Sequence, residues 1–107
     1  MQPRFVAVLA IDVVGYTRLM ATDRDGTLAD LAAARELLAS VAEGHGGRLA
    51  DVAGDAAVAA FDTAAGAVYA ARAIQSTMAA RAAAQPPARR MLLRVGAHIG
   101  DVVEQAD

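Results

Sequence analysis

The chain has 107 residues, which is long enough for one compact domain, and a net charge of −2. It has no cysteine, which excludes disulfides and thiolate metal sites. Ten basic against twelve acidic residues give no basic surface for nucleic acid or a membrane, and the cysteine-free composition fits a cytoplasmic location. Hydrophobic residues make up 56% of the chain, but no apolar run is long enough for membrane insertion and the N-terminus does not look like a signal peptide.

The first part of the chain is predicted to hold a strand followed by helical segments. Residues 5–11 are apolar and rich in Val and Ile, which predicts a buried strand. The segment GYTRLM predicts one or two helical turns, and ATDRDG a polar turn. A long helix is then expected from Thr27, because Thr27 and Asp30 have the spacing of a capping box. Its apolar stripe comprises Leu31, Ala34, Leu38 and Val41.

A hairpin is predicted next, after the glycines of EGHGG have ended this helix. The apolar runs RLADVA and AAVAAF are separated only by Gly54 and Asp55, which is typical of a β-hairpin. Asp62 or Thr63 is then expected to cap a second long helix.

The second long helix is expected to run to about Ala84, where the prolines of QPPARR end it. Its buried face is expected to comprise Ala67, Val68, Ala71, Ile74 and Met78. Residues 91–99 predict a last strand, with Gly100 and Asp101 turning out of it. The order β-α-β-β-α-β predicts an α+β fold of the ferredoxin-like kind, with an antiparallel sheet and both helices on one face.

Two aspartates are expected to meet at one end of this sheet. Asp12 leaves the first strand and Asp55 lies in the hairpin turn, and an antiparallel arrangement can bring these ends together. Two close carboxylates repel each other unless a cation lies between them, and Mg²⁺ or Mn²⁺ prefers such oxygen ligands. The backbone N–H groups of residues 14–17 are expected to point at phosphate oxygens, as at a helix start. From spacing alone, the structural roles of cap and turn former are favoured for both aspartates.

The segments VLAIDVVGYTRLM, EGHGGRLADVAGDAAVAAF and LLRVGAHIGDVV follow one another along the chain, with the helix DTAAGAVYAARAIQ before the last. In order and spacing they resemble the first part of the class III adenylate/guanylate cyclase catalytic domain. The resemblance covers nearly the whole chain and implies that residues 1–107 form a partial nucleotide cyclase domain. It implies a phosphorus–oxygen lyase that makes cyclic AMP and pyrophosphate from ATP in intracellular signalling. GTP is the less favoured substrate, and the active site would form at the interface of a homodimer.

The resemblance also implies roles for individual residues. Asp12 and Asp55 would be catalytic by binding two Mg²⁺ or Mn²⁺ ions, and Val13 would add a backbone carbonyl to one ion. The segment that lies against the triphosphate would be Gly15, Tyr16 and Thr17. One ion would help to make the ribose 3′-hydroxyl a nucleophile and the other would bind the triphosphate, which is two-metal phosphoryl transfer.

Two positions depart from the family pattern. Asp51 stands at the purine-selecting position, where many relatives carry a lysine, so the base preference is in doubt. Ala56 stands where a glycine is common, which costs some backbone freedom. The family's domain continues with a part that carries the Asn and Arg of the transition state, so this chain alone is expected to be inactive.

Two alternatives stay open at this point. The first is a non-catalytic nucleotide-binding or regulatory module, which Asp51 and the missing part of the domain favour. The second is a plain ferredoxin-like interaction domain, which would bind neither metal nor nucleotide. Substitution of Asp55 by asparagine separates this second alternative from the others, because it would then change no measurable property.

Overall fold

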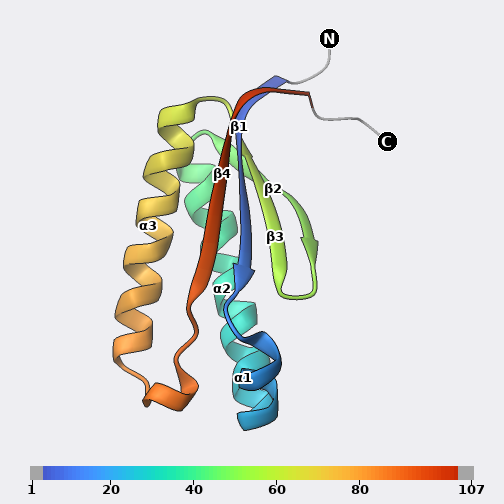
Figure 1. Cartoon of the computed structure of the whole chain (residues 1–107). Coiled ribbons are helices and arrows are strands. Elements are labelled where there is room, and N and C mark those ends of the chain that lie inside the picture. Colours follow the sequence, from blue (N-terminus) through green and yellow to red (C-terminus); the bar gives the residue numbers. More distant parts are fainter. Residues whose placement is uncertain (1–3, 104–107) are drawn as a thin grey trace.

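In the computed structural model, which describes residues 4–103, four antiparallel strands form one sheet in the order β2-β3-β1-β4 (Figure 1). The strands are β1 (Arg4–Val13), β2 (Gly47–Ala53), β3 (Ala56–Phe61) and β4 (Leu93–Val103). The helices are α1 (Tyr16–Thr22), α2 (Arg24–Gly44), α3 (Ala64–Ala83) and a 3₁₀ turn, η1 (Pro87–Arg89). This order confirms the ferredoxin-like prediction, with α1 as a short additional helix between β1 and α2.

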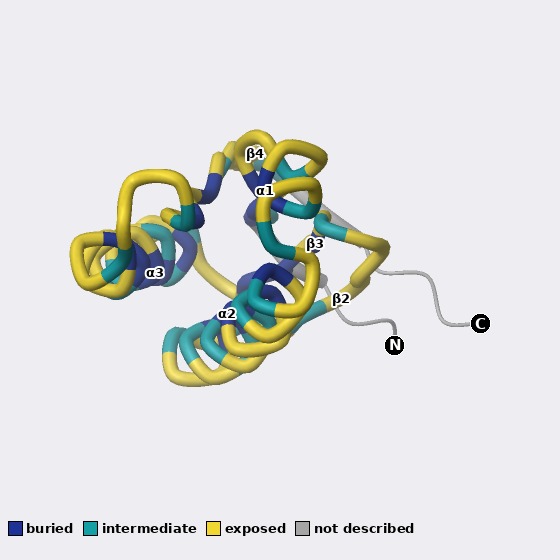
Figure 2. Tube along the Cα trace, turned by 90° about the horizontal axis from the view of Figure 1, so that it is seen from below, coloured by how far each residue is buried: buried dark blue, intermediate teal, exposed yellow. Residues whose placement is uncertain are grey.

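The long helices α2 and α3 lie on one side of the sheet, as predicted, and the buried residues lie between the two layers (Figure 2). Along β1 the side chains alternate, so that Leu9, Ile11 and Val13 face the helices and are buried. Ala10 and Asp12 have the opposite parity and lie on the other face, called here the open face. The alternation therefore places the predicted metal ligand Asp12 away from the apolar core.

The segment ATDRDG is not a turn, contrary to the prediction. Only Asp23 separates α1 from α2. Its backbone N–H donates to the Leu19 carbonyl at 3.0 Å, and its side chain accepts from the Gly26 N–H at 3.0 Å, which caps α2. Thr27, the predicted cap, is buried within α2, and its hydroxyl donates to the same Leu19 carbonyl at 2.9 Å. An earlier and complete cap thus replaces the capping-box pattern at Thr27.

The other elements follow the prediction more closely, except at the end of the last strand. Thr63 caps α3 by accepting from the Gly66 N–H at 2.9 Å. The predicted turn at Gly100 and Asp101 is wrong, because β4 continues through them to Val103. The first residues of β1 offer a partner strand as far as that residue, so the backbone gains more by pairing than by turning.

The predicted helix faces are correct in most positions. In α2 the buried positions that were predicted are Leu31, Ala34 and Leu38, and in α3 they are Ala67, Ile74 and Met78. Ala42 is buried where Val41 was predicted, and Ala70 where Val68 was predicted, so each face is rotated slightly. No helix within residues 4–103 has the length and apolarity to cross a bilayer.

Candidate functional site

Asp12 and Asp55 lie at the same end of the sheet. Asp12 is the last residue but one of β1, and its Cα partner on β3 is Ala56. Asp55 directly precedes Ala56 in the hairpin turn, so it lies one residue beyond this pair. Adjacent strands are about 4.8 Å apart, and both aspartates are half-buried. The predicted neighbourhood of the two carboxylates therefore agrees with the strand register.

The hairpin turn has only two residues, which fixes the position of Asp55. Gly54 has a φ of 59°, and among the described residues only glycines have positive φ. A positive φ followed by a negative one is typical of a type II′ turn, whose twist suits a hairpin. Ala56 already belongs to β3 and pairs with Ala53, so a glycine is not needed there. From α2, the Arg35 side chain donates to the Gly54 carbonyl and ties the turn to the helix.

A third charged residue, Arg94 on β4, belongs to this site and was missed in the sequence. The register places Arg94 directly across from Asp12. Its Nε donates to Asp12 Oδ1 at 2.9 Å, and its Nη2 donates to Oδ2 at 3.4 Å. The only signal is a lone arginine in the apolar segment LLRVGAH, and its meaning depends on a register that the sequence does not show.

Arg94 interacts with both carboxylates. Its pKa is raised above the ordinary value, first by the hydrogen bond to Asp12, then by the charge of Asp12 and more weakly by the charge of Asp55. One cation thus contacts Asp12 and lies in the field of Asp55 at this end of the sheet.

The oxygen atoms of Asp12, Asp55 and the Val13 carbonyl suit a hard divalent cation that takes its remaining ligands from outside these three residues. Among the described residues, no three His, Cys, Asp or Glu side chains gather at one point. A trans peptide directs the Val13 carbonyl away from the Val14 N–H, which donates to the Leu92 carbonyl on the β4 side at 2.9 Å. The Val13 carbonyl therefore points to the β3 side, where Asp55 lies. Two carboxylates and one carbonyl leave room for water or phosphate oxygens, which Mg²⁺ normally retains.

The turn after Asp12 leads into α1 and leaves backbone N–H groups available. Gly15 is the N-cap residue, with a φ of 63°, and within the described chain no side chain caps α1. The first N–H groups of a helix, here those of Tyr16 and Thr17, have no acceptor inside it. The prediction was wrong for Val14, whose N–H already donates to the carbonyl of Leu92, the residue before β4. The Tyr16 side chain is half-buried and packs against the core, and its backbone N–H lies at the start of α1.

Arg18 is a second cation that the sequence analysis missed. It is exposed on α1, and its guanidinium lies over Gly15. A β-carbon at Gly15 would lie 3.3 Å from its Nη2. The positive φ explains the glycine, because this exposed guanidinium can move away from a β-carbon.

Asp51 lies on the open face, two strands away from Asp12. It pairs with Val58 on β3, which in turn pairs with Ala10 on β1. Two strand spacings amount to about 10 Å, so Asp51 lies at the border of the site without contact to Asp12. The pairing of β2 with β3 shifts its register directly before it, between Leu49 and Asp51.

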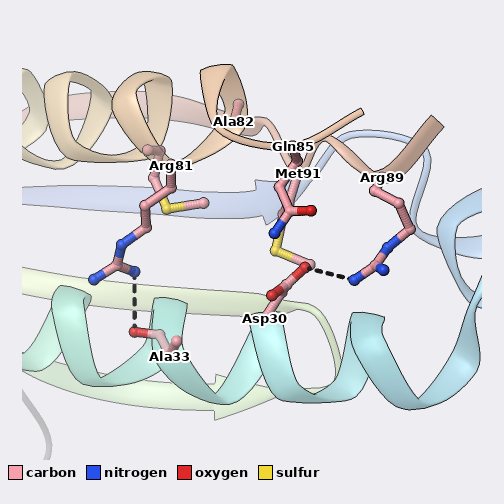
Figure 3. Close-up of a pocket in the computed structure, with 8 residues that line it drawn as sticks. Asp30, Ala33, Arg81, Ala82, Gln85, Arg89 and Met91 are labelled. Atoms are coloured by element: carbon pink, nitrogen blue, oxygen red, sulfur yellow. Dashed lines mark hydrogen bonds and ion pairs between the residues drawn. The ribbon is translucent and has the colours of Figure 1, made fainter. Parts of the chain in front are cut away.

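A small pocket between α2, α3 and η1 is separate from this site (Figure 3). Arg81 donates to the Ala33 carbonyl at 3.4 Å, and Arg89 forms an ion pair with Asp30 at 3.5 Å. The cavity is about 50 Å³, which has room for a few water molecules but not for a nucleotide. None of the predicted site residues lines it.

Comparison with known proteins finds similar cyclases, although no family model matches the chain. A protein of Rhizobium meliloti (strain 1021) named "Putative adenylate cyclase 3" is 41% identical over 106 residues, which are 97% of this chain and 18% of that protein. An adenylate/guanylate cyclase/hydrolase from Silicibacter pomeroyi has a solved structure with 34% identity and a TM-score of 0.84. The match covers 99% of this chain and 63% of that one.

More distant solved structures share the fold. The adenylyl cyclase CyaB from P. aeruginosa is 19% identical with a TM-score of 0.78, and the match covers 96% of this chain and 60% of that one. A bacterial light-regulated adenylyl cyclase is 14% identical with a TM-score of 0.83, over 97% of this chain and 32% of that one. The chain thus spans less than two thirds of each relative. The similarity in sequence and fold to these cyclases agrees with the predicted resemblance to the class III adenylate/guanylate cyclase catalytic domain.

Proposed function

We propose that this chain provides the metal-binding half of a cyclase active site that converts ATP to cyclic AMP and pyrophosphate. The observation that carries the proposal is that Asp12 and Asp55 lie at the same end of the sheet, one residue apart in the strand register, beside the uncapped start of α1. ATP as the substrate is supported by the adenylate cyclase names of the relatives. Asp51 itself favours neither purine, so the choice of base rests on these relatives.

In this proposal Asp12, Asp55 and the Val13 carbonyl hold two Mg²⁺ or Mn²⁺ ions. When bound, the ions would neutralise the triphosphate and activate the ribose 3′-hydroxyl. The chain's own contribution is to hold the metal-binding carboxylates and the phosphate-binding N–H groups in place. The strand β1 and the two-residue turn fix the carboxylates, and residues 15–17 present backbone N–H groups to phosphate oxygens. The missing side chain of Gly15 lets a phosphate approach this backbone.

We further propose that the complete site forms in a homodimer in the cytoplasm. The described residues supply two carboxylates and no group of three metal-binding side chains, which supports a contribution from elsewhere. Groups that bind the base and stabilise the transition state would come from outside residues 4–103 or from the partner. The cytoplasmic location stays a prediction from the cysteine-free composition.

The test is calorimetric titration of this chain with a non-cyclisable ATP analogue, with and without Mn²⁺. We expect binding that requires Mn²⁺ and that Asp55→Asn abolishes, because this variant keeps the shape of the side chain and removes its charge. The matched control is Asp25→Asn, at a carboxylate in the first turn of α2. It should bind the analogue like the unmodified chain.

Three results are informative beyond the expected one. Absence of Mn²⁺-dependent binding would contradict the proposal for this chain. Equal loss in Asp25→Asn would show that general charge, not the site, controls binding. Binding without formation of cyclic AMP from ATP, even in the complete dimer, would support the non-catalytic nucleotide-binding module instead. Competition by GTP then measures the base preference at Asp51.

A further inference from the structure

Arg94 occupies both oxygens of the Asp12 carboxylate. The two contacts, at 2.9 Å from Nε and 3.4 Å from Nη2, form a fork on one carboxylate. Arg94 lies on β4, which is at the edge of the described sheet, and its side chain is 71% exposed. Asp12 lies on the inner strand β1, where its side chain is 40% exposed. The carboxylate is therefore fixed by the fold, whereas its cationic partner is free to move into solvent.

We propose that Arg94 is a positioning residue that holds Asp12 in the metal-free state and yields it to a divalent cation. The inference rests on the proposed metal-binding role of Asp12. In it, metal and guanidinium compete for the same carboxylate oxygens, so Arg94 lowers the affinity of the site for the metal. Without metal, the guanidinium fixes the direction of the carboxylate and compensates its charge.

Two physical arguments support competition over simultaneous binding. A divalent ion bound to Asp12 brings positive charge next to the guanidinium, and like charges at such separations repel. Both carboxylate oxygens already accept hydrogen bonds from Arg94, so a metal that binds either oxygen is brought close to the guanidinium. Exposed ion pairs contribute little to stability, so release of Arg94 is easy. The same weakness limits the effect on metal affinity to about two- to fivefold.

The exposure of Arg94 would also make the competition between the metal and the guanidinium for Asp12 reversible. A buried guanidinium would lose its only partner on release and remain desolvated. Arg94 instead has solvent beside it on the outer side of β4 within residues 4–103. Its charge stays near the site after release, because the backbone of β4 remains paired to β1.

The test is Mn²⁺ binding to the 107-residue chain, measured from the free Mn²⁺ signal in electron paramagnetic resonance. We expect Arg94→Gln to bind Mn²⁺ about two- to fivefold more tightly than the unmodified chain. Arg94→Lys keeps the charge but not the fork, and should fall between the two. The control is Arg72→Gln, which removes the same charge from the exposed surface of α3 and should leave the affinity unchanged. Thermal unfolding confirms that each variant folds.

A second readout follows the contact itself. In NMR spectra, the Nε–Hε signal of Arg94 should shift on saturation with Mg²⁺, and it should not shift in Asp12→Asn. Mn²⁺ binding that Asp12→Asn loses but Arg94→Gln leaves unchanged or weakens would overturn the role of Arg94 and leave the proposed function intact. Absence of Mn²⁺ binding in every variant would overturn both.

Discussion

Replacement of Thr27 by valine is expected to destabilise the chain through one defined hydrogen bond. The Thr27 hydroxyl donates to the Leu19 carbonyl at 2.9 Å and thereby joins α2 to α1. Thr27 is 2% exposed and is the buried polar residue of the described chain. Valine has almost the same shape, so the packing around it is retained while the donor is lost.

The expected magnitude depends on what the Leu19 carbonyl keeps. It also accepts the Asp23 N–H at 3.0 Å, so it loses one donor of two and is not left without a partner. The loss in the free energy of unfolding is then the net value of one hydrogen bond, about 1 kcal/mol. A carbonyl left without any donor in the interior would cost up to about 3 kcal/mol.

Urea unfolding of Thr27→Val and of the matched variant Thr22→Val measures this difference. The Thr22 hydroxyl also donates to a backbone carbonyl at 2.9 Å, that of Arg18, but it is exposed. Water can replace its bond, so the control should change stability by less than about 0.5 kcal/mol. Equal losses in the two variants would refute the argument from burial. A loss of about 3 kcal/mol at Thr27 would show that the Leu19 carbonyl does not keep its second donor.

Three further substitutions, one of them with a matched control, test the fold by the same urea unfolding. Phe61→Ala removes a ring that is 0% exposed and should cost about 3 to 5 kcal/mol; a loss under 2 kcal/mol would mean that the core closes around the gap. Gly54→Ala places a β-carbon in open space, but Gly54 has a φ of 59°, so we expect a loss of about 1 kcal/mol in the free energy of unfolding from the backbone alone. The control Gly96→Ala also meets open space and should not destabilise the chain. Equal effects of the two substitutions would contradict this reasoning. Arg89→Gln removes the ion pairs of Arg89 with Asp23, the cap of α2, at 2.7 Å and with Asp30 of α2 at 3.5 Å. The loss in the free energy of unfolding should be at most about 1 kcal/mol and smaller in high salt. A loss that salt does not reduce would refute an ionic origin.

The element order could be predicted from the sequence because each element has its own local signal. The alternation of glycines, prolines and apolar runs separates the strands from the helices, and Thr63 is a recognisable N-cap residue before α3. The start of α2 was misplaced because two caps compete for it. Asp23 and Thr27 both precede apolar helical residues, and only the packing of α1 decides that Thr27 is buried. The length of β4 depended on its partner β1, which no local pattern reveals.

Of the charged residues at the site, only the two carboxylates could be predicted from the sequence. Asp12 and Asp55 each stand at the end of an apolar run, so topology alone suggested that they meet. Arg94 could not be found in this way, because the pair with Asp12 depends on the register of two strands that are far apart in sequence. Val14 was included wrongly for the same reason, since its acceptor, Leu92, directly precedes the distant strand β4.

The chain can change its length in few places without separating the two carboxylates. One residue inserted into β1 before Leu9 would turn the Asp12 side chain into the helix layer and Leu9 onto the open face. Two inserted residues would restore the face but would shift Asp12 by about 7 Å along the sheet. The hairpin has no spare residue, because Gly54 and Asp55 form its whole turn. The exposed prolines between α3 and β4 lie outside these constraints, so insertions that preserve the site belong there.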